Sequence, residues 1–251
     1  MSSRLVAVAF AIISLFSSYA PEALAERAHF APSIGVRVGA EYYSWEEFDQ
    51  SGSRLLRESG PRGMLAFSFG NLNRRTSGLV FRWEGRGYYG DVNYNGQTQP
   101  APSVPVRSDT EYWGGQTELT GGYRFKDVFS TYSLDLLASG GVNGWRRTIA
   151  NARTSTGTFV NGSTEDYRVF YFKAGAGLFH VHGNWLDYVQ AGMKRPIDTR
   201  EDAHLNGVAS SIIVKPRSQM SFYFSWEIDH LDRQQERTYG ITIYYDSLRF
   251  A

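Results

Sequence analysis

The stretch Met220–Leu231, MSFYFSWEIDHL, decides the fold. Read at every second residue, it places large apolar side chains on one face and hydroxyls and carboxylates on the other. The apolar face consists of Met220, Phe222, Phe224, Trp226 and Ile228. Because successive side chains of a β-strand point to opposite faces, this period of two predicts a strand with one apolar and one polar face. The apolar face requires a second sheet or lipid as its neighbour.

The same alternation recurs along the chain and predicts about ten strands. The segments are Ser33–Tyr43, Arg62–Gly70, Gly78–Gly90, Asp109–Phe125, Ser130–Trp145, Asp166–Val181, Trp185–Lys194, Asn206–Val214, Met220–Leu231 and Arg237–Tyr245. Ordinary globular strands average about five to six residues, whereas a tilted membrane strand needs about nine to eleven. The connections alternate between long and short, which is typical of a barrel with long external loops and short periplasmic turns. Lipid is therefore the favoured neighbour of the apolar face.

Composition narrows the classes of function. The chain has 251 residues, no cysteine and a net charge of +1. These values exclude disulfides and thiolate metal sites, and they give no electrostatic footprint for nucleic acid. Aromatic residues make up 15% of the chain, and the rings of Tyr and Trp suit a membrane–water boundary.

The N-terminal segment predicts export. Arg4 precedes the apolar run Leu5–Phe16, and Ala23–Ala25 has the small-x-small pattern of a cleavage site. We expect a signal peptide over residues 1–25 and a barrel domain over residues 26–251. Because the barrel domain has no other long apolar run, it can span a membrane only as a closed barrel. The predicted fold is all-β, a closed antiparallel up-and-down transmembrane β-barrel of about ten strands.

With this leader, strand length and loop alternation, the chain resembles the small outer-membrane β-barrel proteins of Gram-negative bacteria. The resemblance implies residence in the bacterial outer membrane after export. It also implies two kinds of partner, outer-membrane lipid and the barrel-assembly machinery.

Strand parity assigns ten charged side chains to the lumen. They are Arg37, Glu41, Arg82, Glu84, Arg86, Glu118, Asp135, Lys173, Glu227 and Asp229. Mixed signs indicate mutual pairing, since an unpaired charge in a narrow interior is costly. One interpretation is a polar network that fills the barrel, and the other is a narrow aqueous pore for small solutes.

Three further patterns are candidate sites. The run Gly85–Gly90 matches G-x-G-x-x-G, but no helix follows it, so the nucleotide interpretation fails. His180 and His182 share one strand face with Asp187 nearby, and we expect polar residues at the membrane interface rather than a metal site.

The third pattern is a group of external acids and histidines at the expected rim. It consists of Asp198, Asp202, His204, Asp229, His230 and Asp232. In architecture the chain resembles the omptin barrel proteases, which place acidic pairs and an Asp–His pair at the outer rim. A rim-active hydrolase, either omptin-like or lipid-modifying, is therefore the alternative function. The main expectation is a non-enzymatic structural or surface protein or a narrow channel, with no catalytic residues, cofactor or metal.

Overall fold

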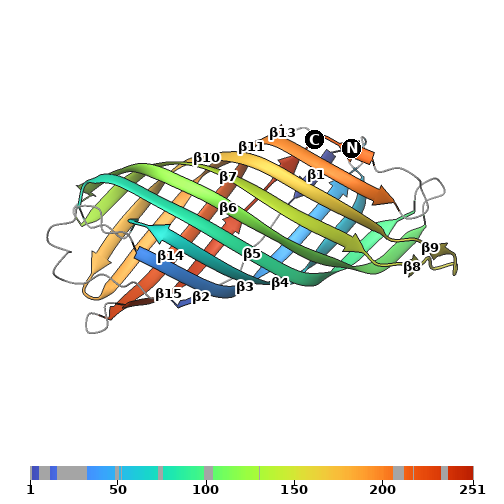
Figure 1. Ribbon diagram of the computed structural model, residues 1–251, viewed down its shortest axis with the longest axis horizontal. Helices are drawn as coiled ribbons and strands as arrows, with labels where there is room; N and C mark the ends of the chain where they lie inside the picture. Colours follow the sequence, from blue (N-terminus) through green and yellow to red (C-terminus); the bar gives the residue numbers. More distant parts are fainter. Residues whose placement is uncertain are drawn as a thin grey trace.

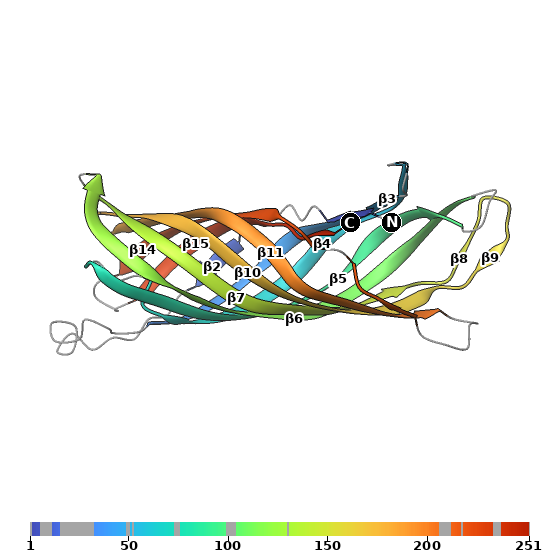
Figure 2. The same ribbon diagram turned by 90° about the horizontal axis from the view of Figure 1, so that it is seen from above.

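The computed structural model describes residues 2–5, 12–15, 33–48, 51, 53–72, 76–98, 104–129, 131–205, 212–216, 218–232 and 237–250. Nine long strands form one antiparallel sheet in which each strand pairs with the next in sequence (Figures 1 and 2). They are β3 (Ser33–Phe48), β4 (Arg54–Gly70), β5 (Gly78–Gln97), β6 (Pro105–Phe129), β7 (Tyr132–Ile149), β10 (Ser163–His182), β11 (Trp185–Leu205), β14 (Ser221–Asp232) and β15 (Arg237–Asp246). The fold is thus an all-β, up-and-down sheet. No helix long and apolar enough to cross a membrane occurs among the described residues.

The remaining strands are short. They are β1 (Ser2–Leu5), β2 (Ile12–Leu15), β8 (Ala152–Arg153), β9 (Phe159–Val160), β12 (Ile212–Val214), β13 (Ser218–Gln219) and β16 (Arg249–Phe250). β8 and β9 form a separate hairpin beyond β7, at the right of Figure 1. The predicted cleavage site at Ala23–Ala25 lies outside the described residues.

The two ends of the sheet differ. At one end, here called the short-turn end, the strands are joined by the segments 71–77, 130–131 and 183–184. At the opposite end, here called the extended end, the strands continue through most of the segments 44–61, 91–108 and 195–205. The prediction of long polar loops was wrong for these three segments, whereas the connection between β7 and β10, residues 150–162, contains only the short strands β8 and β9. The period of two persists in these segments, with Tyr, Trp and Val side chains turned inward.

The strand count also differs from the prediction. Residues 206–211 lie outside the described part, and the rest of the expected strand Asn206–Val214 is the three-residue β12, which pairs with Glu201–Ala203 of β11. β14 pairs directly with β11 instead. The described residues therefore form nine long strands, and β3 and β15 run in the same direction.

The sheet is an open half-barrel. Within the described residues no ladder joins β3 to β15, because each pairs with a segment of the predicted leader. β1 pairs with Trp45–Phe48 of β3, and β2 pairs with Tyr239–Thr242 of β15. The sequence predicted a closed barrel. The sheet is not closed in these pairings, because segments of the predicted leader pair with the edges of β3 and β15.

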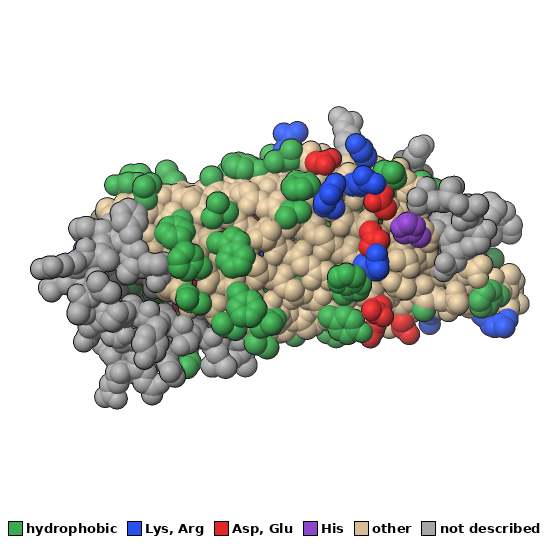
Figure 3. All heavy atoms as spheres, viewed as in Figure 1, with side chains coloured by type: hydrophobic (Ala, Val, Ile, Leu, Met, Phe, Trp, Pro, Cys, Tyr) green, Lys and Arg blue, Asp and Glu red, His purple; other side chains and the backbone are tan. Residues whose placement is uncertain are grey.

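The two faces of the sheet have opposite character. The outward face carries exposed apolar side chains on all nine long strands, among them Val38, Phe67 and Leu119. Toward the extended end this band gives way to exposed charged residues such as Asp91, Glu111 and Arg146. Figure 3 shows the charged side chains beside the apolar ones, nearer the extended end. The inward face is mostly buried and polar.

Candidate functional site

The inward face holds a chain of ion pairs along the whole sheet, which begins at the short-turn end. There Arg124 of β6 donates two hydrogen bonds to Asp135 of β7, at 2.7 and 2.6 Å, and both side chains are fully buried. Tyr188 of β11 donates a third hydrogen bond to Asp135 at 2.7 Å. The Arg124 guanidinium also lies 3.8 Å from the ring centroid of Phe179. The two charges are therefore compensated, and the Asp135 carboxylate accepts bonds at both oxygens.

The middle of the inward face is a network that joins strands far apart in sequence. Arg37 of β3 lies 2.5 Å from Glu84 of β5 and 3.5 Å from Glu227 of β14. Arg82 donates to Glu227 at 2.7 Å, and Arg86 lies 3.9 Å from Glu84. Two carboxylates are thus shared among three guanidiniums, and β14 is tied to β3 and β5 across the interior.

A second central group lies beside the first. Lys173 of β10 is 2.8 Å from Glu118 of β6 and 3.5 Å from Asp246 at the end of β15. Lys194 donates to both oxygens of Asp246 at 2.9 Å, and Tyr171 donates to Glu118 at 2.7 Å. Two lysines and two carboxylates therefore neutralise one another inside the sheet.

Near the extended end, Arg62 of β4 bonds Glu41 of β3 and stacks over aromatic rings. Its Nε donates to Glu41 at 2.9 Å, and its guanidinium lies 3.9 Å and 4.2 Å from the rings of Tyr43 and Tyr88. Tyr244 of β15 donates a hydrogen bond to the other oxygen of Glu41. The inward faces of β3 and β15 therefore touch, although their backbones are not paired.

The last charged group contains one arginine and three carboxylates. Arg147 of β7 lies 3.3 Å from Glu47, 3.6 Å from Glu58 and 3.1 Å from Glu165. Aromatic side chains surround the group, including the stacked pair Trp145 and Tyr167 at 4.8 Å. Because the Arg147 side chain is only 3% exposed, this charged group is shielded from solvent.

Three cavities lie between these groups in the described part of the chain, with volumes of about 70, 50 and 60 Å³. The first is lined by the central network, the second by Glu41, Arg62 and Tyr88, and the third by Leu72, Tyr188 and Asp229. Cavities of this size and polarity hold a few water molecules rather than an organic ligand.

Comparisons with known proteins identify no family. No protein-family model matches the chain, and none of the curated proteins matches it. Among solved structures, the β domain of the Bordetella autotransporter BrkA is similar at 15% identity with a TM-score of 0.25, and the match covers all of both chains. A TM-score of 0.25 does not establish a shared fold or function.

All ten residues assigned to the lumen by parity lie on the inward face. Nine of them take part in the ion pairs described above. Asp229 is also buried, but its Oδ1 has no hydrogen-bond partner among the described residues. Sequence reasoning missed several members of the same network, namely Glu47, Glu58, Arg62, Arg124, Arg147, Glu165, Lys194 and Asp246. Extending the same parity into the expected loops would have found Glu58, Arg147 and Glu165.

The structure separates the residues of the expected hydrolytic rim. Asp229 and His230 pair with Leu186 and Trp185 at the short-turn end, whereas Asp198, Asp202 and His204 lie near the extended end. Asp229 is paired with a residue 16 positions before Asp202 on β11, which corresponds to roughly 50 Å at about 3.3 Å per residue. Asp229 and His230 therefore do not lie beside Asp198, Asp202 and His204, and at the extended end His204 instead lies 4.0 Å from Asp166. The glycine-rich run Gly85–Gly90 lies inside β5, as regular strand.

Proposed function

We propose that this protein is an outer-membrane β-barrel whose interior is filled by paired charges, and that it serves as a structural or surface protein or as a narrow channel for small solutes. One observation carries the proposal, namely the division between an apolar outward face on every long strand and a charged, paired inward face. In water this arrangement would expose large apolar surface, whereas in a bilayer the apolar face meets lipid and the paired charges stay inside the sheet. The partners are then outer-membrane lipid and the barrel-assembly machinery, with no catalytic chemistry and no nucleic acid.

The orientation follows from the two ends of the sheet. In outer-membrane barrels the short turns face the periplasm and the long connections face outward. The short-turn end would therefore be periplasmic. The extended end, with its charged outward residues Asp91, Glu111 and Arg146, would stand at and above the outer membrane surface.

Closure follows from removal of the leader. When residues 1–25 are cleaved, the edges of β3 and β15 that now pair with β1 and β2 become free. Unpaired edges inside lipid are costly, which favours pairing of β3 with β15. The hydrogen bond from Tyr244 to Glu41 already joins their inward faces. Since both strands run in the same direction, we propose a parallel seam.

Conductance of the purified protein in a planar bilayer tests this function. The paired interior and its small cavities lead us to expect no current or only small, brief openings. The Glu227→Gln variant, which frees Arg82 from its carboxylate partner, should conduct more than wild type. A large, steady wild-type conductance would instead show an open porin-like lumen.

A further inference from the structure

Two histidines and one aspartate gather on the outward face at the short-turn end. His180 and His182 end β10, and Asp187 follows on β11, across the turn at Gly183 and Asn184. Gly183 has a φ of +59°, a left-handed conformation that glycine adopts readily and that lets the chain reverse within two residues. The reversal pairs His180 directly opposite Asp187 in the β10–β11 ladder.

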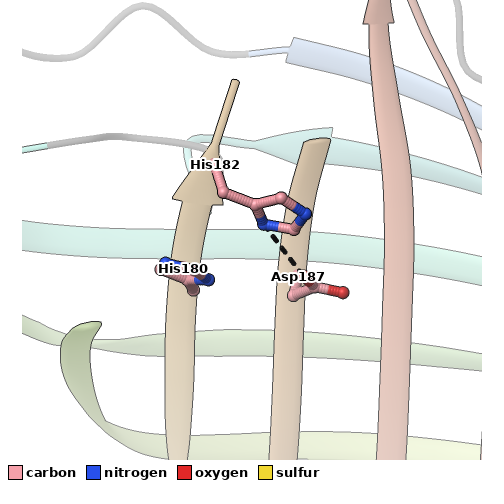
Figure 4. A group of neighbouring side chains, drawn as sticks. All are labelled: His180, His182 and Asp187. Carbon is pink, nitrogen blue, oxygen red and sulfur yellow. Dashed lines mark ion pairs between the residues drawn. The ribbon is translucent and has the colours of Figure 1, made fainter. Parts of the chain in front are cut away.

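The side chains converge beyond this backbone pairing. Nδ1 of His182 lies 3.4 Å from Oδ2 of Asp187, and the rings of His180 and His182 are stacked with centroids 5.1 Å apart. Figure 4 shows the His182 imidazole extended across the turn toward Asp187. One ligand atom from each of the three residues lies within 4.8 Å of the other two.

These distances suit a single metal ion. Zinc holds imidazole nitrogen and carboxylate oxygen at about 2.0–2.2 Å, so two ligand atoms on one ion lie at most about 4 Å apart. The His182 side chain is 53% exposed and that of Asp187 is 29% exposed, so small side-chain rotations can close the remaining gap. His180 stacks on Tyr132 at 4.4 Å, which restricts the orientation of one imidazole before any ion binds.

We propose that His180, His182 and Asp187 bind one divalent transition-metal ion such as Zn²⁺. Two imidazoles and one carboxylate are the donors that this class of ion prefers, whereas Mg²⁺ and Ca²⁺ prefer oxygen ligands. Three protein ligands leave a fourth position open to water or to a further ligand. The site lies on the outward face and does not depend on whether the interior conducts.

Zinc binding to the purified full chain, carried on a tag without histidine, tests the proposal. Competition against a chromogenic zinc chelator should give one site per chain, and His182→Ala and Asp187→Asn should each weaken the affinity at least tenfold. His204→Ala is the matched control, because His204 is an exposed histidine on the extended end of the same strand β11, 4.0 Å from Asp166. This variant should bind as wild type does.

A second readout separates loss of ligands from loss of fold. Bound Co²⁺ should give wild-type protein a visible absorption that is absent from both site variants, while the variants keep the wild-type gel migration of unboiled protein. The proposal is overturned if wild-type protein takes up less than one Zn²⁺, or if correctly folded His182→Ala and Asp187→Asn bind Zn²⁺ with wild-type affinity.

Discussion

Glu227 offers the sharpest test of how the interior is stabilised. Its carboxylate accepts a hydrogen bond from Arg82 at 2.7 Å and lies 3.5 Å from Arg37, and its side chain is only 8% exposed. Glu227→Gln keeps the shape but removes the charge. Removing one partner of a buried ion pair typically costs about 3 to 5 kcal/mol, because the remaining charge stays buried without compensation. Arg37 keeps Glu84 at 2.5 Å, so the loss falls mainly on Arg82, and we expect about 3 kcal/mol.

A surface ion pair provides the matched control. Arg146 and Asp166 are separated by the same 2.7 Å, but their side chains are 44% and 35% exposed. Exposed pairs contribute about 0 to 1 kcal/mol, so Asp166→Asn should change stability by no more than that. Both substitutions replace a carboxylate with an amide in an ion pair of the same 2.7 Å distance, one buried and one exposed.

The assay is urea unfolding in lipid vesicles, followed by tryptophan fluorescence and by gel migration of unboiled samples. Adding Arg82→Met to Glu227→Gln should recover part of the lost stability, since the buried charge that lacked a partner is then gone. Equal effects of Glu227→Gln and Asp166→Asn, or no recovery in the double variant, would refute the argument that burial makes these pairs interdependent.

Two further predictions concern the lipid-facing surface and the seam. Phe224 lies in the middle of the apolar band on β14, and Phe224→Arg should destabilise the folded protein in vesicles by about 2 to 4 kcal/mol. Thr148 faces outward near the extended end, and Thr148→Arg should cost only about 0 to 1 kcal/mol. Equal costs would place Phe224 outside the lipid. The proposed seam brings inward positions of β15 and β3 together. In a chain that starts at Glu26, the cysteine of Tyr244→Cys should therefore form a disulfide with that of Gly39→Cys or Glu41→Cys. No other cysteine competes, because the sequence has none. If neither pair oxidises and non-reducing gels show only free thiols, β3 and β15 are not neighbours after cleavage.

Local alternation explains why the faces were predictable from the sequence. A strand repeats every two residues whatever it pairs with, so the inward positions of Arg37, Glu118 and Glu227 follow from their neighbours in sequence. The ion-pair partners of these residues do not follow from neighbouring residues in the sequence. Arg37 of β3 and Glu227 of β14 meet because the sheet curves and brings its first and last strands around one interior, which is a property of the whole sheet.

The errors arose where pairing between distant segments decides the outcome. The sequence alone cannot show that β14 pairs directly with β11, and this pairing moves Asp229 and His230 to the short-turn end. The β10–β11 ladder also shifts register between Phe170 and Tyr171, and a shift of one residue reverses the parity beyond it. His180, His182 and Asp187 were visible in the sequence, but only the tight turn at Gly183 shows how closely they lie.

Fractionation of cells that express the chain is the measurement that tests the transmembrane assignment most directly. The account predicts that the protein sediments with the outer membrane, needs detergent for extraction, and migrates differently on a denaturing gel before and after boiling. These properties follow from an apolar outward face in lipid and a closed, hydrogen-bonded sheet. Recovery as a soluble periplasmic protein, with no detergent requirement and no change in migration on boiling, would contradict the account.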